Sequence, residues 1–380
     1  MNFAKSLNLS GDRFVVTYSL FCSYDEALTQ ANEISVENTI EFPPDLLPDG
    51  DIKNKLTGNV LEVTEMSPGE TRVIISYPVE TTANELIYIL NVTFGNVSMM
   101  RNVKVENIEL PDILLSKIQG PRYGRKGLRE LLNVPTRPLL CAALKPMGLS
   151  SNEFAEIITQ FGMGGIDIIK EDHNIGNQRF ASFKERIKIC ADAINNTVQK
   201  TGRKCLYIPN ISGPVTEILD RAAFAKESGA GGVMLIPGLV GLDFIRVLAE
   251  DDAFNLPIMH HPAFHGTYVH NPIQGFSFGS WYGLLPRLFG SDFSVYPNFG
   301  GRFSYPREGV KQIIEQTNTP MGHIKTIFPT PGGGMTLDNI PEMLDFYGKD
   351  VVFLMGGGLF RGAKSLQENC LRMREMVEKY

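Results

Sequence analysis

The sequence predicts an α/β protein with an N-terminal ferredoxin-like α+β domain followed by a C-terminal (β/α)8 TIM barrel. Glycine is unevenly distributed, with six glycines in residues 1–120 and thirty-one in the remaining 260. A β-α-β-β-α-β order of patterns precedes this boundary, and eight β-α pairs follow it. We therefore expect two domains, residues 1–125 and 126–380, with QGPRYGRKGLRELLNVPTRP as their connection.

The N-terminal domain is expected to contain four strands and two helices. The second and third strands are separated by a Ser-Pro-Gly-Glu turn, which favours a tight reversal. The expected strands are Arg13–Ser23, Asn59–Met66, Arg72–Val79 and Asn102–Leu110, and the expected helices are Tyr24–Ile34 and Ala83–Val92. This order is that of a ferredoxin-like domain.

In the C-terminal domain, short apolar runs rich in β-branched residues alternate with segments of helical period. The expected strands are Leu139–Lys145, Ile166–Glu171, Cys205–Asn210, Gly232–Ile236, Pro257–His261, Asp292–Tyr296, Ile324–Phe328 and Val351–Met355. The expected helices include Asn152–Phe161, Phe183–Gln199, Val215–Ser228, Arg307–Thr317 and Leu337–Tyr347. Eight such pairs over about 245 residues are typical of a TIM barrel. A doubly wound sheet is the alternative, but it has no reason to stop at eight.

Composition and charge exclude several classes of protein. A chain that is 43% hydrophobic and 21% charged is typical of a soluble globular protein, and a net charge of −6 without a block of Lys or Arg excludes a general nucleic-acid binder. Five scattered cysteines without a CxxC spacing argue against a disulfide framework and a structural zinc site. The N-terminus lacks a signal-peptide core, and Gly231–Leu242 is too short to span a bilayer. We expect a cytoplasmic protein without nucleic-acid or membrane partners.

Polar residues gather at the ends of the expected barrel strands, where TIM barrels carry their chemistry. The first strand ends in Lys145, the second in Lys170-Glu171-Asp172-His173 and the third in Asn210. Because side chains alternate along a strand, Lys170 and Asp172 should point to one side and Glu171 to the other. A modified Lys170 and Asp172 could then share a hard cation, with His173 as a third ligand. The alternative is a structural ion pair in the barrel interior.

Four of the six histidines lie within His260–His270, at and after the fifth strand. His261 and His265 are candidates for proton transfer or substrate contact. His260 should point away from His261 along the strand and is interpreted as structural. His270 and His323 are interpreted as surface histidines or as histidines whose ring nitrogens are hydrogen-bonded, without a functional role.

Two glycine clusters follow the seventh and eighth strands, at Gly332-Gly333-Gly334 and Gly356-Gly357-Gly358. Bare backbone N–H groups in these two loops lie where TIM barrels bind phosphate. Glycine also serves tight turns, so one cluster alone would carry little weight. The pair predicts a phosphate site formed by Gly332, Gly333, Gly357 and Gly358.

The motifs at these strand ends resemble those of the RuBisCO superfamily. The resembling segments are LCAALKPMGLS (140–150), GGIDIIKEDHN (164–174), IPNIS (208–212), HHPAFH (260–265) and FLMGGGLFRGAKS (353–365), with GNVSMMRNVKVENIELP (95–111) and QGPRYG (119–124) in the first domain and its connection. The resemblance extends over nearly the whole chain. It implies a catalytic homodimer with its active site at the subunit interface and a phosphorylated ketose as substrate.

The resemblance also implies roles for particular residues. Lys170 would be carbamylated by carbon dioxide and hold Mg²⁺ together with Asp172, and Lys145 would be the acid or base. Asn96 and Glu37 would reach the partner subunit's site, and the four glycines would hold the phosphate. The α-proton of the ketose would be removed to give a metal-bound enediolate.

This chain departs from the carboxylases of that family at four places. His173 stands where the metal motif has Glu, Met147 where they have a second lysine, and Pro262 where an arginine binds a second phosphate. The segment YPNFGGRF (296–303) replaces the loop whose lysine orients carbon dioxide. These changes favour a RuBisCO-like protein of the form IV type that acts on a monophosphate and does not fix carbon dioxide.

Carbamate, Asp172 and a neutral His173 would give the metal about −2 of ligand charge instead of about −3, which favours ions that accept nitrogen, such as Mn²⁺. Alternatively, His173 serves as a proton shuttle. The leading hypothesis is a metal-dependent isomerase or enolase of the methylthioribulose 1-phosphate type. The alternatives are a decarboxylase of a phosphorylated 3-oxo sugar acid of the 3-oxo-isoapionate 4-phosphate type, a non-catalytic paralogue, and a Schiff-base aldolase that uses Lys170.

Overall fold

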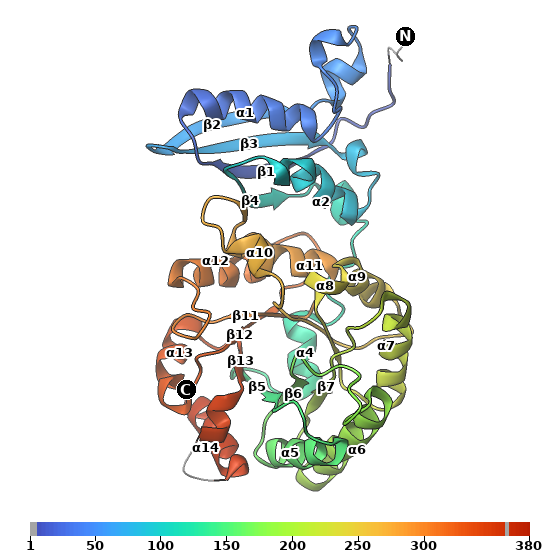
Figure 1. Ribbon diagram of the computed structural model, residues 1–380, viewed down its shortest axis with the longest axis vertical. Helices are drawn as coiled ribbons and strands as arrows, with labels where there is room; N and C mark the ends of the chain where they lie inside the picture. Colours follow the sequence, from blue (N-terminus) through green and yellow to red (C-terminus); the bar gives the residue numbers. More distant parts are fainter. Residues whose placement is uncertain (1–5, 362–364) are drawn as a thin grey trace. The chain divides into compact units, whose positions relative to one another are not determined.

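The computed structural model describes residues 6–361 and 365–380, and the chain divides into two compact units (Figure 1). One unit contains the chain up to Gln119 together with His265–Leu285 and Met321–Ile324; the other contains Gly120–Phe264, Pro286–Pro320 and Lys325–Tyr380. The start of the N-terminal segment (1–5) and the end of the strand-8 motif (362–364) lie outside the described residues. The domain boundary at residue 125 stays a prediction.

The first unit is built on a sheet with the strand order β10-β4-β1-β3-β2. Its strands are β1 (Arg13–Leu20), β2 (Asn59–Ser67), β3 (Glu70–Pro78), β4 (Val103–Glu109) and β10 (Gly275–Phe276), and its helices are α1 (Tyr24–Glu37), α2 (Leu86–Phe94), α3 (Asp112–Leu115) and α10 (Gly266–Val269). β1 is antiparallel to both β3 and β4, which confirms the expected ferredoxin-like fold. β10 was not expected, because a two-residue strand that pairs with β4 leaves no periodic pattern in the sequence.

Local sequence explains how this unit folds. Alternate residues of β1 are completely buried, among them Phe14, Val16 and Tyr18, as a half-buried strand requires. Helix α1 begins with a capping box in which the Ser23 backbone N–H donates to Glu26 Oε2 over 3.0 Å. The helix then buries Ala27, Ala31 and Ile34, which lie three or four residues apart along one face.

The second unit contains eight parallel strands in the order β7-β6-β5-β13-β12-β11-β9-β8. They are β5 (Leu139–Leu144), β6 (Ile168–Glu171), β7 (Leu206–Ile208), β8 (Val233–Leu235), β9 (Ile258–His260), β11 (Phe293–Pro297), β12 (Phe328–Gly332) and β13 (Val352–Met355). β7 and β8 are joined by one parallel bridge between Asn210 and Met234, supported by Met234 N–H to Pro209 O at 2.8 Å and Ile211 N–H to Met234 O at 3.0 Å. This seam completes the expected barrel.

Helices surround the strands of this unit (Figure 1). They are α4 (Gly124–Leu132), α5 (Ser151–Met163), α6 (Phe183–Thr201), α7 (Ile218–Glu227), α8 (Pro237–Val240), α9 (Asp243–Glu250), α11 (Leu285–Phe289), α12 (Arg307–Asn318), α13 (Ile340–Tyr347) and α14 (Leu366–Glu378). Within the described ranges, no helix has the length and apolar character needed to cross a bilayer.

The seventh barrel strand was predicted at the wrong place. It was expected at Ile324–Phe328, but β12 runs from Phe328 to Gly332 and includes two prolines. A proline has no N–H to donate to a neighbouring strand, so its presence argues against a central strand. Here β12 pairs along its whole length with β11, whereas its pairing with β13 is limited to Gly332 and Leu354.

The barrel interior is a single apolar cluster. Its strand residues are Leu139, Cys141, Ala143, Ile168, Leu206, Ile208, Met234, Met259, Phe293, Val295, Phe328, Val352 and Leu354. Leu128 and Leu132 of α4 join this cluster, which includes the first residues of β5, β11, β12 and β13. Helix α4 therefore closes the N-terminal end of the barrel and leaves the C-terminal end for chemistry.

A buried carboxylate fixes the start of α4. Asp292 accepts backbone N–H bonds from Tyr123 at 2.9 Å, Gly124 at 2.7 Å and Ile258 at 2.9 Å. Burial raises the pKa of Asp292 to about 6, although these three bonds oppose the shift. The side chain thus connects the beginning of the helix to β9.

We expect Asp292→Asn to lower the free energy of unfolding by about 2–3 kcal/mol, because an amide nitrogen would face at least one buried N–H donor. Urea denaturation would measure the change, with an unchanged m-value. Asp345→Asn, on an exposed face of α13, is the matched control and should shift stability by less than about 0.5 kcal/mol. Equal stability of the two variants would contradict the role of Asp292.

Candidate active site

The predicted strand-end residues of β5 and β6 come together in the structure. The two strands are parallel neighbours, with Ala143 opposite Lys170 and Leu144 opposite Glu171. This register brings Lys145, the residue after β5, to Asp172, and their side chains form an ion pair. The Lys145 side chain is 43% exposed, so it can be reached from solvent.

Asp172 is the centre of the site. Its Oδ1 accepts from His173 Nδ1 at 2.7 Å, and its Oδ2 bonds to Lys145. Burial alone would raise the pKa of the Asp172 carboxyl, but the bonds from His173 and Lys145 and the charge of Lys170 hold that pKa well below its usual range. The group is therefore a carboxylate over the whole physiological pH range.

Lys170 is almost completely buried and 2% exposed. Desolvation lowers the pKa of its amine to about 8, and the positive charge of Lys145 acts in the same direction, whereas Asp172 opposes it. Its Nζ donates to the carbonyl oxygen of Glu171 at 2.8 Å. A substantial fraction of this amine is thus neutral in mildly alkaline solution, and the neutral amine is the form that reacts with electrophiles such as carbon dioxide.

Glu171 points to the opposite side of β6, as the alternation predicted. Its Oε1 accepts from Arg186 Nε and from the Tyr207 hydroxyl, both at 2.6 Å, and its Oε2 accepts from the Asn210 N–H at 2.9 Å. Both charged side chains are completely buried. This pair fixes β6 against α6 and β7.

We expect Glu171→Gln to destabilise the protein by about 3–5 kcal/mol, because it leaves the Arg186 charge buried without its carboxylate. Thermal and urea unfolding would measure the loss. Glu185→Gln, on an exposed position of the same helix as Arg186, is the control and should be nearly neutral. If Glu171→Gln were as stable as the control, the pair would not support β6.

Asn210 holds the loop that carries the site residues. Its Nδ2 donates to the carbonyl oxygens of His173 and Ile175, both at 3.0 Å, and its Oδ1 accepts from Ser212 N–H at 3.1 Å. The side chain is 2% exposed. These bonds give Asn210 a supporting role in the loop, and its contact with substrate stays a prediction.

Two histidines stack beside the carboxylate. The rings of His173 and His261 are nearly parallel, at 15°, with centroids 4.5 Å apart. His261 follows β9, and its Nδ1 accepts from the Ala263 N–H at 3.1 Å, so a neutral ring carries its proton on Nε2. His260 is buried in the strand, in agreement with its structural interpretation. Lys145, Lys170, Asp172, His173 and His261 thus form one group.

The glycines of the last two loops differ in their surroundings. A Cβ added to Gly333 or Gly357 would have nothing within 4 Å, so both lie beside open space. A Cβ on Gly332 would lie 2.9 Å from Leu354 Cδ2, and one on Gly358 would lie 2.5 Å from the carbonyl oxygen of Met335. Gly333 and Gly357 are therefore better placed for a ligand than Gly332 and Gly358, whose bare backbones allow close packing.

The remaining predicted residues lie in the first unit. Asn96 and Glu37 are adjacent, because Asn96 Nδ2 donates to Glu37 Oε1 at 2.9 Å. His265 is buried, with its ring centroid 5.4 Å from that of Trp281 and 5.7 Å from that of Tyr282. Burial lowers the pKa of His265 to about 3, so the ring is neutral. Roles for these three residues in substrate binding stay predictions.

The donors of the site fit a divalent cation in kind. Among the described residues, no three His, Cys, Asp or Glu side chains converge closely enough to hold a metal. Lys170 as a carbamate would add anionic oxygens to the Asp172 carboxylate, as hard cations require. The bond from His173 Nδ1 to Asp172 leaves Nε2 as the nitrogen for coordination, in the pattern common for metal-bound histidine.

Comparisons with known proteins identify the family of this chain. Residues 124–298 match the family model described as ribulose bisphosphate carboxylase large chain, catalytic domain. A ribulose bisphosphate carboxylase-like protein 1 from Rhodopseudomonas palustris is 32% identical over 96% of this chain and 98% of its own length. The chain belongs to the RuBisCO-like family.

Other members of the RuBisCO-like family are similar over most of their length. A 5-methylthioribulose-1-phosphate isomerase from Rhodospirillum rubrum is 30% identical over 94% of each chain, and a 2,3-diketo-5-methylthiopentyl-1-phosphate enolase from Bacillus licheniformis is 31% identical over 91% of this chain and 86% of its own. A crystal structure of a Rubisco-like protein from Rhodopseudomonas palustris superposes with a TM-score of 0.87 at 32% identity, covering 97% of this chain and 98% of that one.

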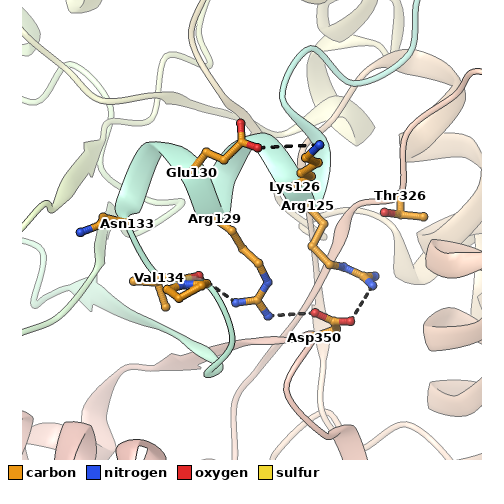
Figure 2. A pocket seen from close by; sticks show the side chains of 9 residues that line it. Arg125, Lys126, Arg129, Glu130, Asn133, Val134, Thr326 and Asp350 are labelled. Atoms are coloured by element: carbon orange, nitrogen blue, oxygen red, sulfur yellow. Dashed lines mark hydrogen bonds and ion pairs between the residues drawn. The ribbon is translucent and has the colours of Figure 1, made fainter.

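The RuBisCO-like barrel has a hollow beside α4, at the end opposite the candidate active site. It has a volume of about 510 Å³ and is lined by Arg125, Lys126, Arg129, Glu130, Asn133, Val134, Pro135, Thr326 and Asp350. Figure 2 shows Arg125 and Arg129 converging on Asp350, at 3.1 and 2.8 Å. Arg129 also donates to the carbonyl oxygens of Val134, Arg137 and Lys349. These bonds connect α4 to neighbouring loops, which is a structural role.

Sequence reasoning missed the support of the site in this RuBisCO-like chain. Arg186 was not singled out, although it lies on the buried face of α6 with Phe183, Ile187 and Cys190. A charged residue on an apolar helical face is a signal for a buried ion pair. The Tyr207 hydroxyl also donates to Glu171, but nothing in the sequence distinguishes this tyrosine from other aromatic residues in strands.

Proposed function

We propose that this chain is a metal-dependent isomerase or enolase that removes the α-proton of a phosphorylated ketose and proceeds through an enediolate, without fixing carbon dioxide. The observation that carries the proposal is the group formed by Lys145, Lys170, Asp172 and His173 at the C-terminal ends of β5 and β6. The activities in the names of the isomerase and enolase relatives support the same reaction class.

In this proposal Lys170, as a carbamate, and Asp172 would hold Mg²⁺, and His173 would contribute a nitrogen ligand that also makes Mn²⁺ suitable. When bound, the metal would supply Lewis-acid stabilisation of negative charge on the substrate oxygens. Asp172 is suited to bind a cation because its carboxyl group stays ionised. Lys170 is suited to form a carbamate because burial lowers the pKa of its amine. Asn210 and the Glu171–Arg186 pair keep the loop and β6 in place.

Protons are moved by the remaining side chains of the group. Lys145 is accessible, and proton transfer to or from the α-carbon is assigned to its Nζ. His261 carries a proton on Nε2 when neutral, which allows it to donate a hydrogen bond to a substrate oxygen. The backbone N–H groups near Gly333 and Gly357 would bind the phosphate.

The proposed absence of carboxylation is supported by two groups of the carboxylases that the chain lacks, as the resemblance to them implies. Pro262 cannot replace an arginine that binds a second phosphate, and residues 298–304 contain no lysine to orient carbon dioxide. The proposal therefore names a monophosphate as substrate. We further propose a cytoplasmic homodimer in which Asn96 and Glu37 of one subunit complete the partner's site.

Proton exchange in D₂O tests this proposal directly. Purified protein would be incubated with 5-methylthioribulose 1-phosphate, 2,3-diketo-5-methylthiopentyl 1-phosphate and phosphorylated 3-oxo sugar acids, with Mg²⁺ and bicarbonate or with EDTA. We expect metal-dependent exchange of the α-proton with one of the two ketose phosphates. Absence of exchange with every compound would favour a non-catalytic paralogue. Release of carbon dioxide from the 3-oxo acids alone would favour a decarboxylase, and borohydride trapping of a lysine adduct a Schiff-base aldolase.

A further inference from the structure

Three loops at the C-terminal end of the barrel lie backbone against backbone. They are residues 298–304 after β11, residues 333–336 after β12 and residues 356–358 after β13. A Cβ added to Gly334 would lie 2.5 Å from Gly301 Cα, and one added to Gly301 would lie 3.0 Å from Gly333 C and from Gly334 N. A Cβ added to Gly358 would likewise lie 2.5 Å from the Met335 carbonyl oxygen. These distances require glycine at Gly334 and Gly358, and at Gly301 a side chain would displace the neighbouring backbone.

The same loops contain two glycines that are not packed against other backbone. Gly333 and Gly357 have open space where a side chain would be, one in each of the last two loops. Gly333 is the direct neighbour of Gly334, which contacts Gly301. A displacement of Gly301 would therefore also displace the backbone of Gly333, which lies beside the open space. Gly301 itself does not face this space.

The loop after β11 is held in place where it begins, at Asn298 and Phe299. Asn298 is 1% exposed; its N–H donates to Gly332 O at 2.9 Å, and its Oδ1 accepts from the Tyr347 hydroxyl at 2.6 Å. The Phe299 ring packs on Phe346, with centroids 4.6 Å apart, and the Arg307 guanidinium lies 4.2 Å from the centre of the Phe299 ring. The loop thus has a fixed base from which it meets its neighbour.

A compact turn presents Gly301 to that neighbour. The Gly300 N–H donates to Ser304 Oγ at 2.8 Å, and the Ser304 N–H donates to the Gly301 carbonyl oxygen at 3.2 Å. Arg302 and Phe303, at the tip of the turn, are exposed, and the guanidinium lies 4.6 Å from the centre of the Phe303 ring. The tip therefore faces solvent while Gly301 faces the glycines after β12.

We propose that Gly301 is a positioning residue for phosphate binding, which acts by supporting the backbone of Gly333 and Gly334 from the neighbouring loop. This inference rests on the proposed function, because it takes the phosphate to lie beside Gly333 and Gly357. Gly301 contacts neither the phosphate nor the reacting atoms in this arrangement. The loop after β11 is then a fixed support for the phosphate loop.

The test is Gly301→Ala. The φ angle of Gly301 is outside the left-handed region, so alanine is compatible with its backbone, and the new methyl group acts only through its 3.0 Å contacts. We expect the KM for the phosphorylated substrate to rise about tenfold, with kcat within about twofold, because small displacements at a binding group weaken binding. Phe303→Ala, at an exposed position of the same loop, is the control and should leave both constants unchanged.

A second variant avoids any added bulk. Ser304→Ala removes the Oγ that accepts from the Gly300 N–H and loosens the turn, so it should raise the same KM about threefold, in line with the loss of one hydrogen bond. If both Gly301→Ala and Ser304→Ala kept the wild-type KM, the proposed role of Gly301 would be wrong.

Binding of inorganic phosphate separates this inference from the function on which it rests. Hydrogen exchange of wild-type protein with phosphate should show protection of backbone amides in 332–335 and 356–359, and Gly301→Ala should need about tenfold more phosphate for the same protection. Equal protection in both proteins would overturn the role of Gly301 and leave the phosphate site intact. No protection in the wild-type protein would overturn the phosphate site, and the role of Gly301 with it.

Discussion

Lys170→Met is expected to reduce turnover at least about a thousandfold, since loss of a bound metal removes several kcal/mol of transition-state stabilisation. The substitution removes a buried amine whose pKa is lowered to about 8 and replaces it with an apolar chain of similar length. Metal binding should be lost together with activity, because the carbamate would provide one of two anionic ligands. Titration with Mn²⁺, followed by electron paramagnetic resonance, measures that binding without turnover.

Two further measurements complete this test. Protein incubated with ¹³C-bicarbonate should show a carbamate carbon signal in the wild type, and the signal should be absent from Lys170→Met. Lys188→Met, at an exposed position of α6, removes a lysine elsewhere and should keep the signal, the metal and the activity. Full turnover by Lys170→Met would show that Lys170 has no part in the reaction.

Gly357→Val is expected to raise the KM for the phosphorylated substrate about tenfold to a hundredfold, which corresponds to the loss of one or two hydrogen bonds to a charged group. The free protein has space for the new side chain, since a Cβ at Gly357 meets nothing within 4 Å and its φ angle is not in the left-handed region. The thermal stability of this variant should therefore equal that of the wild type. Steady-state kinetics and thermal unfolding together measure the two effects.

Gly358→Val is the matched comparison. Its Cβ would lie 2.5 Å from the Met335 carbonyl oxygen, so this variant should lose stability, whereas Gly357→Val should lose affinity. An unchanged KM in Gly357→Val would remove Gly357 from the phosphate site.

The sequence predicted those features of the site that depend only on residues adjacent in the chain. Alternation along β6 correctly placed Lys170 and Asp172 on one side and Glu171 on the other, since the direction of a strand's side chains depends on the strand alone. The ion pair of Lys145 with Asp172 was not predicted, because it depends on the register of β5 against β6. Stacking of His173 on His261 likewise joins loops that are far apart in the chain.

The glycine clusters show a second limit of prediction from the sequence. The sequence predicted their place after the last two strands, but adjacent glycines have opposite surroundings. Gly333 and Gly357 lie beside open space, whereas Gly334 and Gly358 lie against other backbone. Such a difference arises from three loops packing together, and composition does not encode it. The misplaced seventh strand has a related cause, since its prolines are tolerated through pairing with β11.

The seam between β7 and β8 connects the stability of the barrel to its activity. It is held by the bridge between Asn210 and Met234 and by the bond from the Gly231 N–H to the Tyr207 carbonyl oxygen at 2.8 Å. The Asn210 side chain also holds the carbonyl groups of His173 and Ile175. Displacement of Asn210 when this seam opens would break both sets of bonds. Local unfolding takes place first where few contacts hold the chain. The protein should therefore lose activity at a lower urea concentration than the one at which its barrel unfolds.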